Sequence, residues 1–158
     1  MPPDRVEVVV DPTALTRSPS GSIAGPVWLR FGGDAAGEPA AFPQPGWSDF
    51  PVVVLAWWLA RLARDLGGRE AVERCDFMDG PFRFTVRRRR GDPRWELAGS
   101  EGGGATGPAA HVEGAVFLDS LAEGARAVHA ECAARGWGGA DVEALARAVE
   151  QAAYYRAT

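Results

Sequence analysis

Hydrophobic residues in the middle of the chain recur every three or four positions, which is the spacing of one face of an α-helix. Ser48 or Asp49 can cap the start of this segment, Pro51 fits its first turn, and Gly67-Gly68 fits its end. The pattern therefore predicts a central helix over about 49–66, with a core-facing stripe formed by Val52, Leu55, Leu59, Leu62 and Leu66.

The opposite face of this predicted helix changes character along its length. Its first turns carry Phe50, Val54 and Trp57, whereas its last turns carry Arg61 and Arg64. The apolar run is about eleven residues long, and a membrane-spanning helix needs about 20, so we expect no membrane segment. Monomers rarely leave large apolar surfaces exposed, so other segments of the chain or a partner must cover the first turns. We expect the chain's own segments to do so.

Residues 71–99 carry the strongest β-strand pattern, an alternation of apolar and polar side chains. Two turn signals, Asp79-Gly80 and Gly91-Asp92-Pro93, predict a three-stranded antiparallel meander with one wet face. This register places Glu96 opposite Arg87. The inward face would then hold two cross-strand pairs, Phe77–Phe82 and Cys75–Phe84, together with Val86, Trp95 and Leu97.

Three further segments have the pattern of strands, namely 5–10, 23–31 and 111–117. Gly25-Pro26 interrupts the second of them, which indicates a sheet edge or a bulge. Residues 32–46 and 100–110 are rich in small residues and are expected to form flexible loops within the domain.

Two more helical patterns lie toward the C-terminal end. One extends from Leu118 to about Ala134, and the other starts at Asp141, which we expect to cap it. We therefore predict a single α+β domain over 1–158. It would have a mainly antiparallel sheet of five to six strands, with the central helix and the two C-terminal helices packed on the apolar face of that sheet.

The charge balance narrows the class of partner. The chain has 17 basic residues and 21 acidic residues, which give a formal net charge of −4. This balance argues against a nucleic-acid partner and would favour a basic protein partner. The first residues include Asp4 and Arg5 where a signal peptide would be apolar, so we expect a cytoplasmic protein. Cys75 and Cys132 are predicted to be buried free thiols, and a disulfide between them is the less favoured alternative.

No group of residues in the sequence has the spacing of a known reactive site. Histidine and cysteine pairs with metal-ligand spacing are absent, and the glycine-rich segment lacks the lysine of a phosphate loop. Carboxylates such as Asp76 and Asp79 have structural roles in the predicted meander. We therefore expect no catalytic residue, cofactor or metal, and no enzymatic activity.

One run of like charges, the four arginines at 87–90, stands out. On a strand, Arg87 and Arg89 would point outward and Arg88 inward, close to Trp95. Such a run is usually a solvated strand end that opposes aggregation. The alternative is a site for a phosphate or an acidic partner.

The patterns FPxxGWxDFPVVVLxWW at 42–58, CxFMDGPFxFxV at 75–86 and RGW at 135–137 resemble small bacterial immunity proteins of polymorphic toxin systems. The resemblance extends over about 42–97 and 111–137. It implies an intracellular single-domain protein that binds and neutralises a toxin domain. It implies no catalytic residues.

Two functions of different classes therefore remain open. The first is a non-catalytic protein-binding inhibitor, as a monomer or weak homodimer. The second is a small-molecule-binding domain or small enzyme, with a pocket between sheet and helix lined by Trp57, Phe84, Arg88 and Trp95. The candidate partner or pocket surface comprises Trp57, Trp58, Arg61, Arg83, Arg87, Arg88, Arg89 and Trp95.

Overall fold

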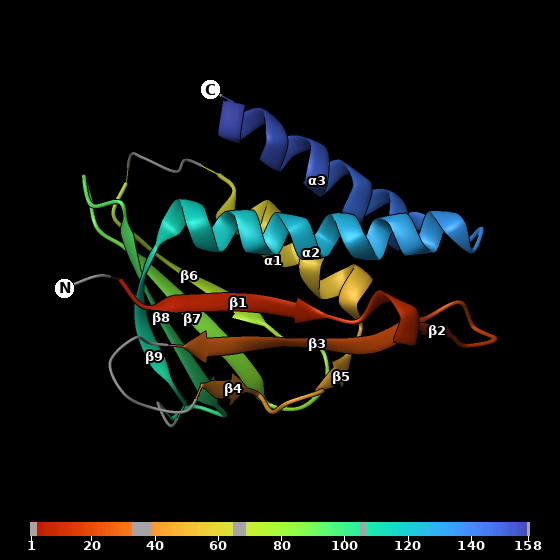
Figure 1. The fold of residues 1–158 in the computed structure, drawn as a ribbon, viewed down its shortest axis with the longest axis horizontal. Helices are drawn as coiled ribbons and strands as arrows, with labels where there is room; N and C mark the ends of the chain where they lie inside the picture. The colour runs from red at the N-terminus through yellow and green to blue at the C-terminus, as the bar shows by residue number, and fades with distance from the viewer. Residues whose placement is uncertain (1–2, 33–38, 65–68, 105–106, 158) are drawn as a thin grey trace.

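The computed structural model describes residues 3–32, 39–64, 69–104 and 107–157, and these ranges contain two antiparallel sheets and three helices (Figure 1). The predicted α+β class and the two C-terminal helices are confirmed. The strands are divided between two sheets, of five and four strands within the described ranges, and do not form one sheet of five to six.

The first sheet is built around β3 (Ile23–Gly32). Its partners are β1 (Arg5–Val10), β2 (Thr16–Arg17), β4 (Ala40–Phe42) and β5 (Ser48–Asp49). Over residues 29–31 both β1 and β4 pair with β3, so β3 is central there. At Gly25-Pro26 the described residues pair with β5 alone, between the parts of β3 that pair with β1 and β2, which agrees with the predicted edge or bulge. The Val27 N–H donates to the Trp47 carbonyl (2.9 Å), so the Pro26 nitrogen points away from β5. On the side of β3 to which this nitrogen points, no described strand pairs with Pro26. The N–H that proline lacks is therefore not needed for a hydrogen bond between strands.

The second sheet confirms the predicted meander and adds a fourth strand. Its order is β6 (Ala71–Asp76), β7 (Phe82–Arg88), β8 (Arg94–Glu101) and β9 (Ala109–Glu113). Cys75 lies opposite Phe84, and Arg87 lies opposite Glu96, as the turn positions predicted. Phe84, Trp95 and Leu97 are buried, whereas Phe82 is half-buried against the Trp47 ring (5.0 Å between centroids).

Both predicted loops contain strand residues in the structure. Residues 40–42 of the first predicted loop form β4, because they pair with β3. In the second, β8 continues to Glu101 and β9 begins at Ala109, so the connection is shorter than expected. Two parts of these predicted loops, at 33–38 and 105–106, lie outside the described residues.

The strand predicted over 111–117 is wrong in its second half. The strand ends at Glu113, and α2 (Gly114–Ala134) begins at the next residue. Gly114 permits this change of direction because it sits against the Trp95 ring, where an added Cβ would lie only 2.3 Å from the indole. Phe117 therefore points from the first turn of α2 into the core, with its ring near Phe84 (6.2 Å between centroids).

The central helix is α1 (Pro51–Leu62), shorter than predicted at both ends. Phe50 occupies the N-cap position instead of Ser48 or Asp49. The described part of the predicted stripe is buried, while its last member, Leu66, and the predicted end at 67–68 lie outside the described residues.

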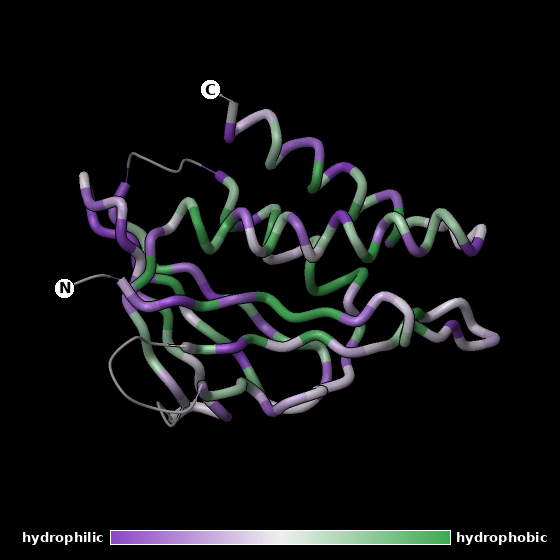
Figure 2. The backbone as a smooth tube through the Cα atoms, in the orientation of Figure 1, coloured by the Kyte–Doolittle hydropathy of each residue, from purple (hydrophilic) through white to green (hydrophobic). Residues whose placement is uncertain are grey.

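The last helix, α3 (Ala140–Ala157), packs along α1 and α2. It begins one residue before Asp141, which lies in the first turn and is not the cap. Its buried face includes Val142, Leu145 and Ala152. Figure 2 shows α3 alternating between hydrophilic and hydrophobic segments, as expected for a helix with one face in solvent.

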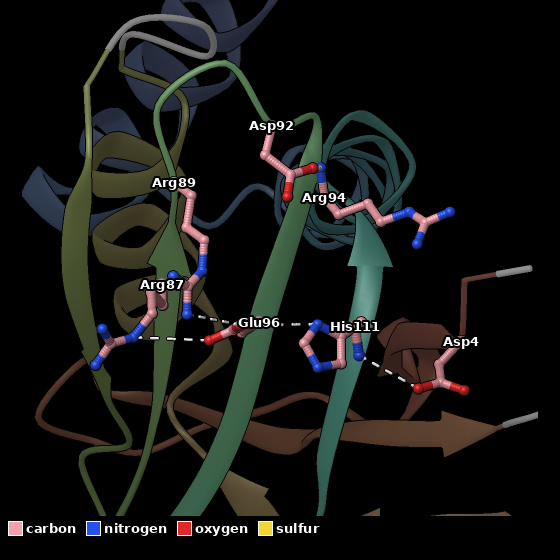
Figure 3. A network of polar contacts seen from close by, with 7 residues as sticks. All are labelled: Asp4, Arg87, Arg89, Asp92, Arg94, Glu96 and His111. Carbon is pink, nitrogen blue, oxygen red and sulfur yellow. Dashed lines mark hydrogen bonds and ion pairs between the residues drawn. The ribbon is translucent and has the colours of Figure 1, made fainter. Parts of the chain in front are cut away.

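The two sheets meet where the N-terminal segment reaches β9 (Figure 3). The Asp4 N–H donates to the His111 carbonyl (2.7 Å), and the His111 N–H donates to the Asp4 carboxylate (3.2 Å). These two bonds satisfy part of the β9 edge. At the opposite end of the same sheet, β6 has no partner strand among the described residues.

Candidate functional site

A groove of about 820 Å³ lies over α1, between α3 and the edge strand β6. We call it the α1 groove. Its volume falls in the range of about 300–1,000 Å³ that is common for binding sites. The residues that line it are Ala56, Trp57, Trp58, Ala60, Arg61, Arg64, Glu73, Arg74, Cys75, Asp76, Ala144, Arg147, Ala148 and Gln151.

Trp57 is the largest exposed side chain of the groove. It is 50% exposed, although Val54, one turn earlier on the same face of α1, is fully buried. Phe50 is half-buried. The expectation that the chain covers this face is therefore confirmed for Val54 and wrong for Trp57, because α3 and β6 line the two sides of the groove and leave the indole between them open.

The charged side chains of the groove are mostly basic. Four arginines line it, Arg61, Arg64, Arg74 and Arg147, against two carboxylates, Glu73 and Asp76. Arg74 forms an ion pair with Asp76 (3.3 Å). The other three arginines form no ion pair with another described residue, and all three side chains are exposed. The groove is thus locally positive in a chain whose formal net charge is −4.

Trp58 is buried, and its role is structural. Its indole packs edge-on against Phe77 and Phe84, with 4.9 and 5.0 Å between centroids. Its Nε1–H donates to the Asp76 carbonyl (2.8 Å). Because that carbonyl lies at the end of β6, Trp58 attaches the helix to this strand.

Arg88 and Trp95, two further candidate residues, also lie in the core. The Arg88 guanidinium donates to the carbonyls of Leu62 (3.0 Å) and Arg64 (2.8 Å), and it lies 4.7 Å from the centre of the Trp95 ring. It therefore satisfies carbonyls at the C-terminal end of α1, where a positive charge also suits the helix dipole. A pocket between sheet and helix was predicted to be lined by four residues. Only one of them, Trp57, lines the α1 groove, because Phe84, Arg88 and Trp95 are buried in the core.

The other three candidate arginines lie on the outer face of the second sheet, away from α1. Arg87 and Arg89 both reach Glu96, at 3.7 and 3.4 Å (Figure 3). Arg83 approaches Asp76 (3.5 Å). This arrangement is that of a solvated sheet face with short-range charge pairing, as the alternation predicted.

Cys75 reaches the groove wall but is almost fully buried, as is Cys132, and both are free thiols. Burial raises the pKa of the Cys75 thiol well above its ordinary value, and the nearby Arg61 only partly opposes this. Burial also raises the pKa of Cys132. The thiolate is the reactive form, so neither cysteine has the properties of a nucleophile.

We therefore expect a thiol reagent to detect no cysteine in the native protein at neutral pH. After denaturation without reductant it should detect two thiols, because both residues are free. Ellman titration before and after addition of guanidinium measures this. Detection of none after denaturation would show that the two cysteines form a disulfide in solution.

Asp49 is a buried carboxylate that sequence analysis considered only as a helix cap. It is 2% exposed. Its two oxygens accept hydrogen bonds from the Trp47 indole (3.1 Å) and from the backbone N–H groups of Phe50 (2.7 Å), Met78 (3.2 Å) and Asp79 (3.0 Å). It therefore ties the start of α1 to the β6–β7 turn.

Three of the candidate residues, Trp57, Trp58 and Arg61, line the groove, and the other lining residues were not predicted. Arg74 and Arg147 belong to separate elements, and no local pattern indicates that both approach α1. The described residues contain no group of three or more histidine, cysteine or carboxylate side chains arranged to hold a metal. In the described part of the chain no helix combines the length and apolarity that a membrane span requires.

Comparison of the chain with known protein families, with curated proteins and with solved structures finds no match.

Proposed function

We propose that this protein is a non-catalytic protein-binding module of the immunity type, which inhibits a toxin domain by binding it at the α1 groove. The observation that carries the proposal is the half-exposed Trp57 with arginines beside it. Tryptophan and arginine are enriched among the residues that contribute most to protein–protein affinity. The sequence resemblance to immunity proteins supports the same class of function.

The charge of the groove indicates the chemistry of the partner surface. Four arginines against two carboxylates leave a local excess of two positive charges. An acidic patch on the partner complements this excess, and such complementarity accelerates association and excludes basic surfaces. The net negative charge of the whole chain by itself favours a basic partner. The positive charge of the groove instead requires that the part of the partner in contact with it be acidic.

The test uses the product of the gene beside the one for this protein, which we expect to contain a toxin domain. We expect it to bind the purified protein, and we expect Trp57→Ala to weaken binding by about 2 kcal/mol or more, roughly 30-fold. Isothermal titration calorimetry measures this. Because Trp57 is 50% exposed, the substitution should cost less stability than the loss of a buried tryptophan, which is about 3–5 kcal/mol.

Tyr154→Ala is the matched control, because Tyr154 is an exposed aromatic residue (67%) of α3 that does not line the groove. It should leave affinity unchanged. Equal losses for both variants, or no effect of Trp57→Ala on a measurable complex, would mean that the α1 groove is not the binding surface. No binding of the neighbouring domain would contradict the proposed function itself.

A further inference from the structure

The edge of β6 that borders the α1 groove presents backbone groups that have no strand partner among the described residues. The Phe77 N–H donates to the Phe82 carbonyl (3.1 Å), in register with the pairing of β6 and β7. In an antiparallel pair, alternate residues direct both backbone groups to the partner strand. Glu73 and Cys75 therefore face β7, whereas Val72 and Arg74 direct their N–H and C=O groups to the open edge.

Within the described residues, one bond closes part of this edge. The Asp76 carbonyl accepts the Trp58 Nε1–H, which ends the free edge at that residue. No described residue bonds the outward backbone groups of Val72 and Arg74, and in the described part of the chain β6 is the terminal strand of its sheet. Natural sheets usually protect such an edge, and an unprotected one is a template for an added strand.

Resting on the proposed function, we propose that the partner contributes one extended strand to the β6 edge, and that acidic and apolar residues alternate along this strand. Backbone hydrogen bonds to Val72 and Arg74 would provide part of the affinity, as in other cases of strand addition. Side chains on the two faces of the added strand would provide the specificity.

The two faces of β6 differ in chemistry, which is why alternation is expected. On the outer face, Arg74 is exposed and pairs with Asp76 of its own strand (3.3 Å), and an acidic side chain of the added strand would meet the same guanidinium. On the inner face, the added strand would lie over the α1 groove. There Trp57 offers an apolar contact, and Arg61 flanks it.

A second copy of this chain fits the edge poorly. Two copies of the chain could pair through their β6 strands in antiparallel fashion. The outward-facing residues of one β6 must then lie opposite those of the other, and the two longest such pairings are centred on Glu73 or on Arg74. The first places two glutamates opposite each other and the second places two arginines opposite each other. Like charges directly across a strand pair are destabilising.

The first experiment measures binding of a fluorescein-labelled peptide of alternating Glu and Val, eight residues long, by fluorescence anisotropy at low salt. We expect saturable binding, and a loss of about tenfold or more for the Lys-Val counterpart and for Arg74→Glu. Two further peptides carry N-methyl groups on the Glu amides or on the Val amides. Only every second amide of an added strand faces β6 and donates a hydrogen bond to it. One of the two N-methylated peptides should therefore fail to bind, and the other should still bind.

The second experiment follows amide hydrogen exchange by NMR. In the free protein the amides of Val72 and Arg74 should exchange faster than those of Glu73 and Cys75. Saturating peptide should slow exchange at Val72 and Arg74 by about tenfold or more. Circular dichroism of Arg74→Glu verifies that the variant is folded.

Strand addition is wrong if the Glu-Val peptide does not bind, if both N-methyl sets act equally, or if Val72 and Arg74 stay unprotected in the complex. The same exchange measurement on the complex with the toxin domain separates this inference from the proposed function. If the domain binds and Trp57→Ala weakens it while those two amides stay unprotected, the function stands and strand addition is wrong. A sedimentation shift without peptide, accompanied by protection of both amides, would show a second copy on the edge and would also overturn the proposal.

Discussion

Asp49→Ala is expected to lower the free energy of unfolding by about 3–5 kcal/mol, the worth of two or so hydrogen bonds to a charged group. The carboxylate is 2% exposed and accepts four hydrogen bonds, so its removal takes the acceptor from the Trp47 indole and from three backbone N–H groups, all of them partly buried. Each unsatisfied buried donor costs about 1–3 kcal/mol before the structure relaxes. Urea unfolding followed by tryptophan fluorescence and by circular dichroism measures the loss.

Asp49→Asn provides a graded comparison, because it keeps the shape and one acceptor oxygen. Its amide nitrogen would face two N–H donors, so we expect an intermediate loss. Asp141→Ala is the control, since Asp141 is exposed in the first turn of α3 and should cost about 0.3–1 kcal/mol. If Asp49→Ala costs no more than Asp141→Ala, the hydrogen bonds of Asp49 do not stabilise the fold in solution.

Arg88→Ala is the second substitution with a large expected effect, a loss of about 3–5 kcal/mol of stability, because it removes two hydrogen bonds from a buried charged group. It removes the donors to the carbonyls of Leu62 and Arg64 and the contact with the Trp95 ring. Arg88→Lys keeps the charge, but an ammonium lacks the planar fork that reaches two carbonyls and stacks on the indole. We expect its loss to lie between that of alanine and zero.

The neighbouring residue is the matched control for this experiment. Arg87 lies on the same strand, but its side chain is 49% exposed and pairs with Glu96 at 3.7 Å. Exposed pairs of this kind contribute about 0–1 kcal/mol, so Arg87→Ala should be nearly neutral. Equal losses at the two positions would contradict the assignment of Arg88 to the core. Thermal and urea unfolding of Arg88→Ala, Arg88→Lys and Arg87→Ala measure these losses of stability.

The meander is the part of the fold that sequence patterns predicted best. Its strands are joined by short turns, and a shift of the register by one residue would move every aromatic side chain to the opposite face. The positions of Asp79-Gly80 and Gly91-Asp92-Pro93 therefore determine both the pairing of Cys75 with Phe84 and the inward direction of Arg88. The buried stripe of α1 was likewise predicted from local spacing, that of apolar residues three or four positions apart.

Two errors arose where distant residues control local structure. The segment after Glu113 has enough apolar residues for a strand, yet it begins α2 because Gly114 fits against Trp95. Trp57 has the composition of a core residue, and it is exposed because α3 and β6 leave a gap over α1. Each outcome depends on a contact with an element far from the segment in sequence.

Periodicity and turn chemistry were sufficient for the α+β class, the strand register and the direction of most core side chains, because these depend on spacing within about ten residues. The division into two sheets, the hydrogen bonds of Asp49 and the α1 groove depend on contacts between residues far apart in the chain. Arg74 and Arg147 line one groove only because β6 and α3 pack on either side of α1. The energies that favour this packing are distributed over the whole core and have no periodic signature in the sequence.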